Sequence, residues 1–255
     1  TRLLLTLAAD CLRSPTFAED ELARIKELTL AAIASQQEDV DTVASRLLQE
    51  RLFGDHPYHL DPLGTEQSVK ALTRAGVEAH YRRIVHPEGM VLAVYGDVDR
   101  GDVYRMVKDL FGDWSGAGAE ALKLGSAEAP GEPVRVDRMR DQEQGILSIG
   151  FIGPTLDAPD RFALDVLDAA FSGVDYPGGR LHRKLRGDQL VYATHMVPVR
   201  GIEPAYTLIY AGTEPGKLPI VEDIVRALVR QVQDEPLGVE ELERAKQMCI
   251  CAQQV

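Results

Sequence analysis

The chain has 255 residues, a formal net charge of −12 and an apolar content of 45%, values that suit a globular protein with room for two cores. The acidic balance argues against nucleic acid and anionic membrane surfaces as partners. Three cysteines and six scattered histidines are too few for a disulfide scaffold or a structural zinc framework. Because no apolar run of about eighteen residues occurs, no membrane-spanning helix is expected. We expect a soluble protein of the cytoplasm or periplasm.

The first half of the chain is predicted to be mainly helical. Apolar residues recur at helical spacing over residues 1–13, 19–36, 39–53, 68–71, 73–84 and 100–112. The acidic residues at the start of the second segment favour a helix N-terminus, because the helix dipole stabilises negative charge there. Met90–Tyr95 is a continuous apolar run and predicts a buried strand. The turn that follows carries two acids and lacks the glycine pattern of a phosphate-binding loop, so nucleotide binding is not expected.

A linker is predicted between this half and the second. Residues 113–133 are rich in Gly, Ala, Ser and Pro, which is typical of a linker, and we place the linker itself at 123–133. Beyond it, strands are predicted over residues 134–138, 145–151, 192–199 and 205–212, and helices over 158–171, 220–233 and from 239 onward.

The stretch Gly178–Tyr192 combines a short basic helix, a turn and the start of a strand. Leu181 and Leu185 are four residues apart and share one helix face, so they can anchor it to a core. Arg186 ends the helix and Tyr192 follows the turn. Both side chains can donate hydrogen bonds to one acceptor, such as a peptide carbonyl. The alternative is an arginine on a surface helix and a tyrosine packed in a sheet.

An internal repeat links the two ends of the chain. The helix start at 21–26 (ELARIK) follows Pro15, and the similar start at 241–246 (ELERAK) follows Pro236. The two copies are a domain length apart, which favours a duplicated domain. Both termini fall inside helical patterns, so the chain is interpreted as an excised fragment of a longer protein.

Several segments, in this order and spacing, resemble the pitrilysin/insulinase family of zinc metallopeptidases, which includes the mitochondrial processing peptidases. They are Ser14–Leu22, His56–Tyr58, Gly64–Glu66, Val91–Asp99, Gly178–Tyr192 and Glu240–Lys246. The resemblance implies an α+β fold of repeated α/β domains, each an antiparallel sheet with helices on one face, as in the LuxS/processing-peptidase-like metallohydrolases. Residues 1–122 would be the C-terminal part of a first domain, and 134–255 the N-terminal part of a second.

The zinc chemistry of that family uses an HxxEH helix and a glutamate from a later helix. HxxEH is absent here, since none of the histidines has a partner four residues away. By the resemblance, the glutamate position falls on Ala32 and its acidic neighbour on Ile25, and neither can bind a metal. A shifted register would bring Glu27 or Glu38 to the ligand position. We therefore expect no resident cofactor, no catalytic residues in this chain, and zinc only in active relatives or a partner subunit.

The resemblance also assigns a role to the Gly178–Tyr192 stretch. Arg186 and Tyr192 match the family's substrate-binding Arg/Tyr pair, although the spacing is one residue shorter than usual. This implies a non-catalytic partner that binds an unfolded or extended peptide beside a zinc-bearing homologous subunit or half, in a homo- or heterodimer. Two alternatives are a fragment of an active zinc metalloendopeptidase whose HxxEH lies upstream, and a purely structural subunit.

The remaining histidines are not expected to bind metal. His56 and His59 lie in a turn that Pro57 and Pro62 make stiff, and the family has a His-Pro-Tyr sequence there without metal. His182 and His195 flank the Arg/Tyr turn, where surface or sheet positions are expected.

Overall fold

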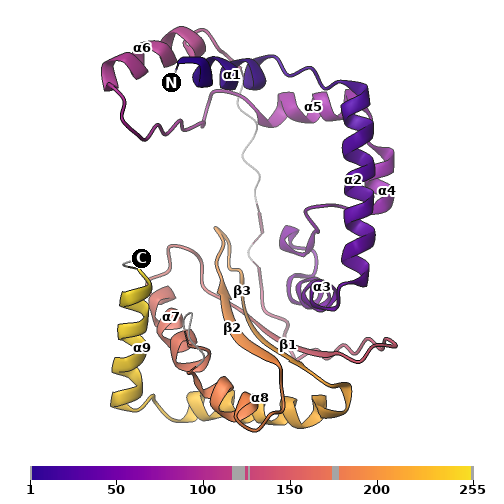
Figure 1. Ribbon diagram of the computed structural model, residues 1–255, viewed down its shortest axis with the longest axis vertical. Helices are drawn as coiled ribbons and strands as arrows, with labels where there is room; N and C mark the ends of the chain where they lie inside the picture. The colour runs from indigo at the N-terminus through magenta and orange to yellow at the C-terminus, as the bar shows by residue number, and fades with distance from the viewer. Residues whose placement is uncertain (1, 117–123, 126, 174–177, 254–255) are drawn as a thin grey trace. The chain divides into compact units, whose positions relative to one another are not determined.

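The computed structural model describes residues 2–116, 124–125, 127–173 and 178–253. These residues form two compact units, one comprising Thr1–Ala34 and Leu63–Lys123 and the other Ser35–Pro62 and Leu124–Val255 (Figure 1). The elements are helices and one antiparallel sheet, so the predicted α+β class is confirmed. Within the described ranges, no helix is long and apolar enough to cross a membrane.

The first unit is built from helices α1 (Arg2–Arg13), α4 (Glu66–Ala71), α5 (Arg74–Ile84), α6 (Arg100–Phe111) and most of α2 (Glu19–Glu38). Threonine or aspartate side chains cap three of these helices, because each accepts a hydrogen bond from a backbone N–H of the first turn. Tyr81 Oη donates to the Leu12 carbonyl at 3.0 Å and so ties α5 to the end of α1. Among the described residues of this unit, the buried apolar side chains are those of Leu5, Ala9, Ile33 and Val69.

The predicted strand over residues 90–95 is not formed. This segment has no regular structure, and its residues are exposed, with Val91 at 92%. An apolar run becomes a strand only when a neighbouring strand satisfies its backbone N–H and C=O groups. Within the described part of the first unit no other segment is a strand, so the run has no partner to pair with.

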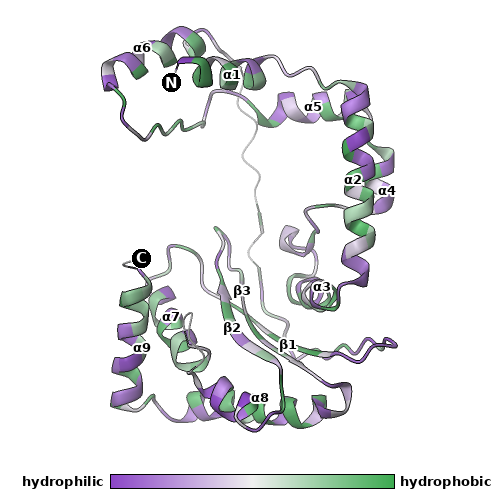
Figure 2. Cartoon of the chain, viewed as in Figure 1, coloured by the Kyte–Doolittle hydropathy of each residue, from purple (hydrophilic) through white to green (hydrophobic). Residues whose placement is uncertain are grey.

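The second unit contains the sheet. Strands β1 (Gly145–Ile152), β2 (Ala193–Val199) and β3 (Tyr206–Thr213) pair in the order β1-β3-β2, antiparallel throughout. The predictions over 145–151, 192–199 and 205–212 are therefore confirmed to within a residue at each end. In Figure 2 the strands are coloured mainly as hydrophobic, whereas the helices alternate between hydrophobic and hydrophilic residues, as expected for helices that bury one face.

One face of the sheet carries the main core of this unit. Helices α7 (Arg161–Phe171) and α8 (Leu218–Asp234) and the π-helical turn η2 (His182–Arg186) contribute to it. The buried members of this core are Phe171, Leu181, Leu185, Val191, Met196, Ile209, Ala211, Val221, Val225 and Leu228. Helix α9 (Val239–Ala252) packs on α7 through small side chains at Ala169, Ala170 and Ala245. Close approach of two helices needs such small residues, because larger ones would hold the axes apart.

The opposite face of the sheet is partly covered by α3 (Val40–Phe53) and the short helix η1 (Pro57–His59). Leu48 of α3 lies over Gly150 so closely that a Cβ there would be 2.7 Å from Leu48 Cδ1. Gln49 Nε2 also donates to Tyr206 Oη at 3.0 Å. By its contacts helix α3 groups with the sheet-bearing unit, and the division into domains at 1–122 and 134–255 stays a prediction. Whether the two units are copies of one domain stays a prediction.

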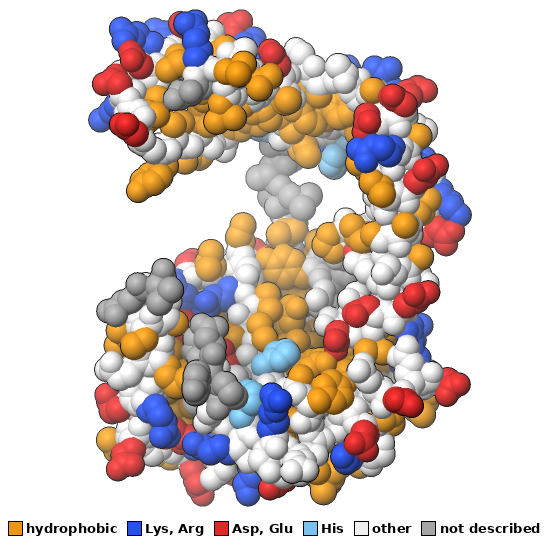
Figure 3. Space-filling view, viewed as in Figure 1, with side chains coloured by type: hydrophobic (Ala, Val, Ile, Leu, Met, Phe, Trp, Pro, Cys, Tyr) orange, Lys and Arg blue, Asp and Glu red, His pale blue; other side chains and the backbone are white. Residues whose placement is uncertain are grey.

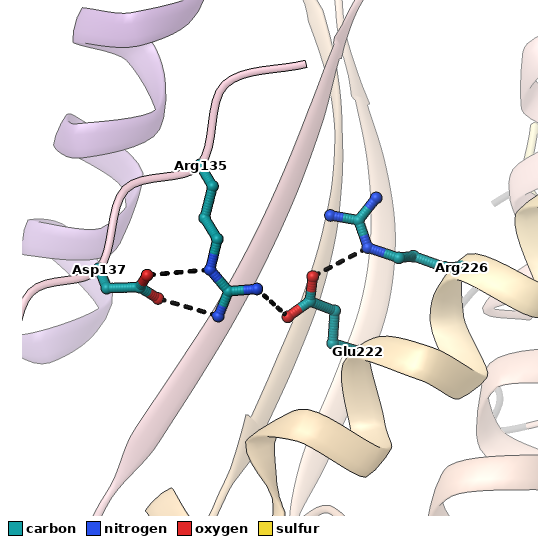
Figure 4. Close-up of polar contacts among 4 residues, drawn as sticks. All are labelled: Arg135, Asp137, Glu222 and Arg226. Carbon is teal, nitrogen blue, oxygen red and sulfur yellow. Dashed lines mark hydrogen bonds and ion pairs between the residues drawn. The ribbon is translucent and has the colours of Figure 1, made fainter.

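Residues 134–138, also predicted as a strand, have no regular structure. An ion-pair network holds this segment against α8 (Figure 4). Arg135 binds both oxygens of Asp137, at 2.9 and 3.1 Å, and donates to Glu222 Oε2 at 2.8 Å, while Glu222 Oε1 accepts from Arg226 at 2.8 Å. The side chain of Glu222 is largely buried. The segment is therefore attached through side chains rather than through backbone pairing with β1.

Candidate functional site

A row of polar side chains crosses the face of the sheet opposite the main core. Ser148 on β1, Tyr210 on β3 and His195 on β2 lie directly opposite one another in the strand register. Their neighbours along each strand point into the core, because side chains alternate between the two faces of a sheet. Figure 3 shows histidine side chains next to a basic side chain on this unit. This polar row is the floor of the candidate site.

Tyr192 lies at one side of this floor, immediately before β2. Its backbone N–H donates to the Gly212 carbonyl at 3.0 Å. Its ring lies so close to Gly212 that a Cβ there would be 2.5 Å from Cε2 and 3.0 Å from the phenol oxygen. Glycine at 212 therefore forms a slot for the ring. The residue as a whole is 45% exposed.

Asp41 reaches the same floor from the first turn of α3. Asp39 caps this helix by accepting a hydrogen bond from Thr42 N–H at 2.7 Å. Two residues later, Asp41 Oδ1 accepts a hydrogen bond from Tyr210 Oη at 2.5 Å. The His195 ring stacks on Tyr210 with 4.6 Å between ring centroids and 12° between planes. One carboxylate is thereby fixed above a stacked pair of rings.

The protonation states of Tyr192, Tyr210 and His195 follow from their burial and from the negative charge of Asp41. Burial raises the pKa of Tyr192, and the negative charge of Asp41 raises it further. Burial, the hydrogen bond to Asp41 and the Asp41 charge together raise the pKa of Tyr210. Burial lowers the pKa of His195, although Asp41 opposes this shift. At neutral pH both phenols are therefore protonated and can donate hydrogen bonds, and His195 is neutral.

Arg186 is the last residue of η2 and is close enough to His182 for its charge to act on that ring, and His182 in turn acts on His195 of the floor. The turn is anchored by Leu181 and Leu185, which are both 0% exposed, as their spacing predicts. Burial lowers the pKa of His182, and the positive charge of Arg186 lowers it further. Arg186 itself is exposed. Within the described residues no hydrogen bond joins it to Tyr192, and both residues are exposed.

The predicted metal position contains no donor. Ala32 on α2 is half-buried, and Ile25, Glu27 and Glu38 on the same helix are exposed. Among the residues that the structure describes, no three His, Cys, Asp or Glu side chains come together as a metal site would need. A methyl group cannot replace a carboxylate ligand, so this donor set does not fit a resident zinc ion.

His56 and His59 have structural partners in the η1 turn. Nδ1 of the buried His56 accepts from Tyr58 N–H at 3.2 Å and so caps η1. Nδ1 of His59 lies 2.8 Å from the His56 carbonyl. Both rings are therefore engaged in forming the turn.

Local sequence did not indicate Asp41, Tyr210 or Gly212. Asp41 and Tyr210 are joined by a hydrogen bond across 169 residues. A lone aspartate at the start of a helix and a tyrosine in a strand are ordinary residues, so only the tertiary structure places them beside Tyr192.

Residues 71–249 match the family model described as the peptidase M16 inactive domain. The chain belongs to this family. The expected resemblance to the pitrilysin/insulinase peptidases is thereby confirmed, with a match to the non-catalytic domain of that family.

Curated relatives of this M16 inactive-domain chain are named as uncharacterized zinc proteases. One from Mycobacterium leprae is 27% identical over 247 residues, which is 96% of this chain and 55% of that protein. YmxG of Bacillus subtilis is 23% identical over 244 residues, covering 95% of this chain and 58% of that protein. The M16 chain therefore spans about half the length of these relatives.

Solved structures show the same fold. The peptidase M16 inactive domain from Pseudomonas fluorescens superposes with a TM-score of 0.82 at 25% identity, covering 97% of this chain and 60% of that one. A protease from Helicobacter pylori superposes with a TM-score of 0.85 at 18% identity, covering 98% and 62%. At this second level of identity the likeness concerns the fold alone.

Proposed function

We propose that this M16 chain is the zinc-deficient half or partner subunit of a zinc metallopeptidase, and that Arg186 and Tyr192 bind the peptide substrate. The observation that supports the proposal is the slot at Gly212, against which the ring of the 45% exposed Tyr192 packs, with a raised pKa that keeps its phenol protonated at neutral pH. Arg186, at the end of a turn anchored by two fully buried leucines, would add a permanent positive charge to the same site.

These two groups suit a peptide carbonyl. A guanidinium and a neutral phenol can both donate hydrogen bonds to one carbonyl oxygen, and the bond from the guanidinium is charge-assisted. Donors fixed in advance stabilise negative charge that develops on that oxygen during hydrolysis, because they need no reorganisation in the transition state. The role of this chain would be to hold and polarise the peptide bond, while the water-activating metal belongs to the partner.

The partner follows from what this chain lacks. Relatives of about twice its length are named zinc proteases, whereas Ala32 occupies the expected ligand position here. A homologous zinc-bearing subunit or half would supply the metal site, as a homo- or heterodimer. The substrate would be an unfolded or extended peptide, which can form backbone hydrogen bonds along a strand edge.

The experiment is a reconstitution of the full chain with a zinc-bearing M16 subunit and a fluorogenic peptide. Arg186→Ala should lower kcat/KM at least about tenfold, which corresponds to about 1.4 kcal/mol of transition-state stabilisation. Tyr192→Phe, which removes only the phenol oxygen, should also lower it. The matched control is Arg183→Ala, because Arg183 lies in the same turn but faces Glu241 on α9.

The two alternatives predict other results. Hydrolysis by this chain alone, dependent on added zinc, would identify an active peptidase. A purely structural subunit would show no affinity for peptide, and its assays would be indifferent to Arg186→Ala and Tyr192→Phe.

A further inference from the structure

The segment that ends at Arg186 is joined to helix α9 by a bidentate ion pair. Nε of Arg180 donates to Oε1 of Glu241 at 2.8 Å, and a second guanidinium nitrogen donates to Oε2 at 2.6 Å. The two side chains are only 14% and 15% exposed. The hydrogen bonding from Arg180 lowers the pKa of Glu241, which is therefore ionised at neutral pH. Two parallel charge-assisted bonds fix a direction as well as a distance.

The apolar anchors of the turn do not supply such a direction. Leu181 and Leu185 are 0% exposed and hold η2 against the core. Because they are four residues apart, they lie along one side of the turn. Apolar burial has no preferred direction, so a turn that is held along one line can still roll about that line. Arg186 follows Leu185 directly and lies roughly a quarter turn further round the axis, so a roll of η2 would displace its guanidinium.

We propose that Arg180 and Glu241 are positioning residues, which fix the roll of η2 and thereby the direction in which Arg186 points. The inference rests on the proposed function and extends it to residues behind the substrate-binding pair. A single π-helical turn is a rare and short element, so it needs support from its surroundings. Helix α9 can give this support, because it packs closely on α7 through Ala245.

Arg183 also contacts Glu241, but this contact contributes little. The guanidinium of Arg183 lies 3.5 Å from Oε1 of Glu241, and its side chain is 53% exposed. Exposed ion pairs of this kind have small free energies, since water screens them. Arg183→Ala therefore leaves the bidentate pair of Arg180 in place, and it remains a valid control for Arg186→Ala.

The first measurement tests the ion pair as a support and does not depend on peptidase activity. Backbone NMR relaxation of the full chain gives order parameters, which report fast motion within the folded protein. Glu241→Gln keeps the shape of the side chain and removes its charge. It should lower the order parameters over residues 183–187 from about 0.85, the value of rigid backbone, toward about 0.6, where backbone is flexible. Unchanged order parameters would mean that the ion pair does not hold the turn.

Two further variants complete this measurement. Glu243→Gln is the matched control, because it makes the same change on the same helix at a residue that pairs with Lys246, and it should leave the order parameters unchanged. Glu241→Gln leaves a largely buried guanidinium without its counter-charge, which can prevent folding. Arg180→Lys is the milder variant, since it keeps the charge but loses the planar fork, and it should loosen the turn in the same direction.

The second measurement tests whether the support acts through Arg186. In the reconstituted peptidase assay, Arg180→Lys should lower kcat/KM about tenfold. When Arg186→Ala is already present, the same change should cost less than about twofold, because both act through one guanidinium. Equal losses in the two backgrounds would show that the ion pair supports only the fold, and would overturn the positioning role. If Arg186→Ala by itself leaves kcat/KM unchanged, the proposed function fails and the positioning role fails with it.

Discussion

Replacing Gly212 by alanine tests whether the position of Tyr192 matters. The backbone at 212 is not in the left-handed region, so alanine adds no backbone strain. Its Cβ would, however, lie 2.5 Å from Cε2 and 2.8 Å from Cζ of Tyr192. Carbon atoms pack at about 3.5–4.0 Å, so the ring must retreat by about 1 Å. The substitution therefore moves the phenol without removing it.

The expected effect on stability is small and the effect on turnover is large. Because Tyr192 is already half exposed, its ring can swing outward, and the free energy of unfolding should fall by about 1 kcal/mol. A displacement of about 1 Å of a catalytic or positioning group can cost about a hundredfold in rate. In the reconstituted peptidase assay we expect kcat/KM to fall between about tenfold and a hundredfold.

The matched control is Gly216→Ala, since a Cβ at Gly216 would meet no atom within 4 Å. This variant should keep full activity. Combining Gly212→Ala with Tyr192→Ala should be no worse than Tyr192→Ala alone, because both act through one side chain. The reasoning is refuted if Gly212→Ala retains full activity, or if its effect adds to that of Tyr192→Ala.

Two further predictions concern the stability of the sheet-bearing unit. Burial raises the pKa of Asp168 to about 6, and a hydrogen bond with Ser172 opposes this shift. The contribution of Asp168 to the free energy of unfolding is therefore complete below about pH 4, and it is lost as the pH rises through about 6. Asp168→Asn should therefore raise the free energy of unfolding above pH 7 by about 1–2 kcal/mol, allowing for solvent screening, and change it little at pH 4. Urea titrations of both proteins at the two pH values measure this. A difference in stability that is the same at both pH values would contradict the prediction. Leu185→Ala empties a fully buried position under Arg186 and should cost about 2–5 kcal/mol. Exposed Leu156→Ala is its control, and equal denaturation midpoints for the two variants would contradict the assigned anchor.

Local sequence was sufficient wherever structure depends on neighbours along the chain. Helical spacing predicted α3, α5 and α6, and the pair Leu181 and Leu185 predicted the anchored turn before Arg186. The order of several short motifs was sufficient to identify the family. These features rest on side-chain period, helix capping and turn chemistry, which act over a few residues.

Tertiary structure decided everything that depends on distant partners. Residues 90–95 and 134–138 have the composition of strands but remain unpaired, because a strand is stable only beside another strand. The hydrogen bond between Asp41 and Tyr210 joins residues far apart in the chain, and the space left by Gly212 has meaning only once Tyr192 lies against it. The sequence alone thus established the family, most helices and the two candidate donors. Their environment was decided by long-range packing, because no local pattern encodes which distant side chain meets them.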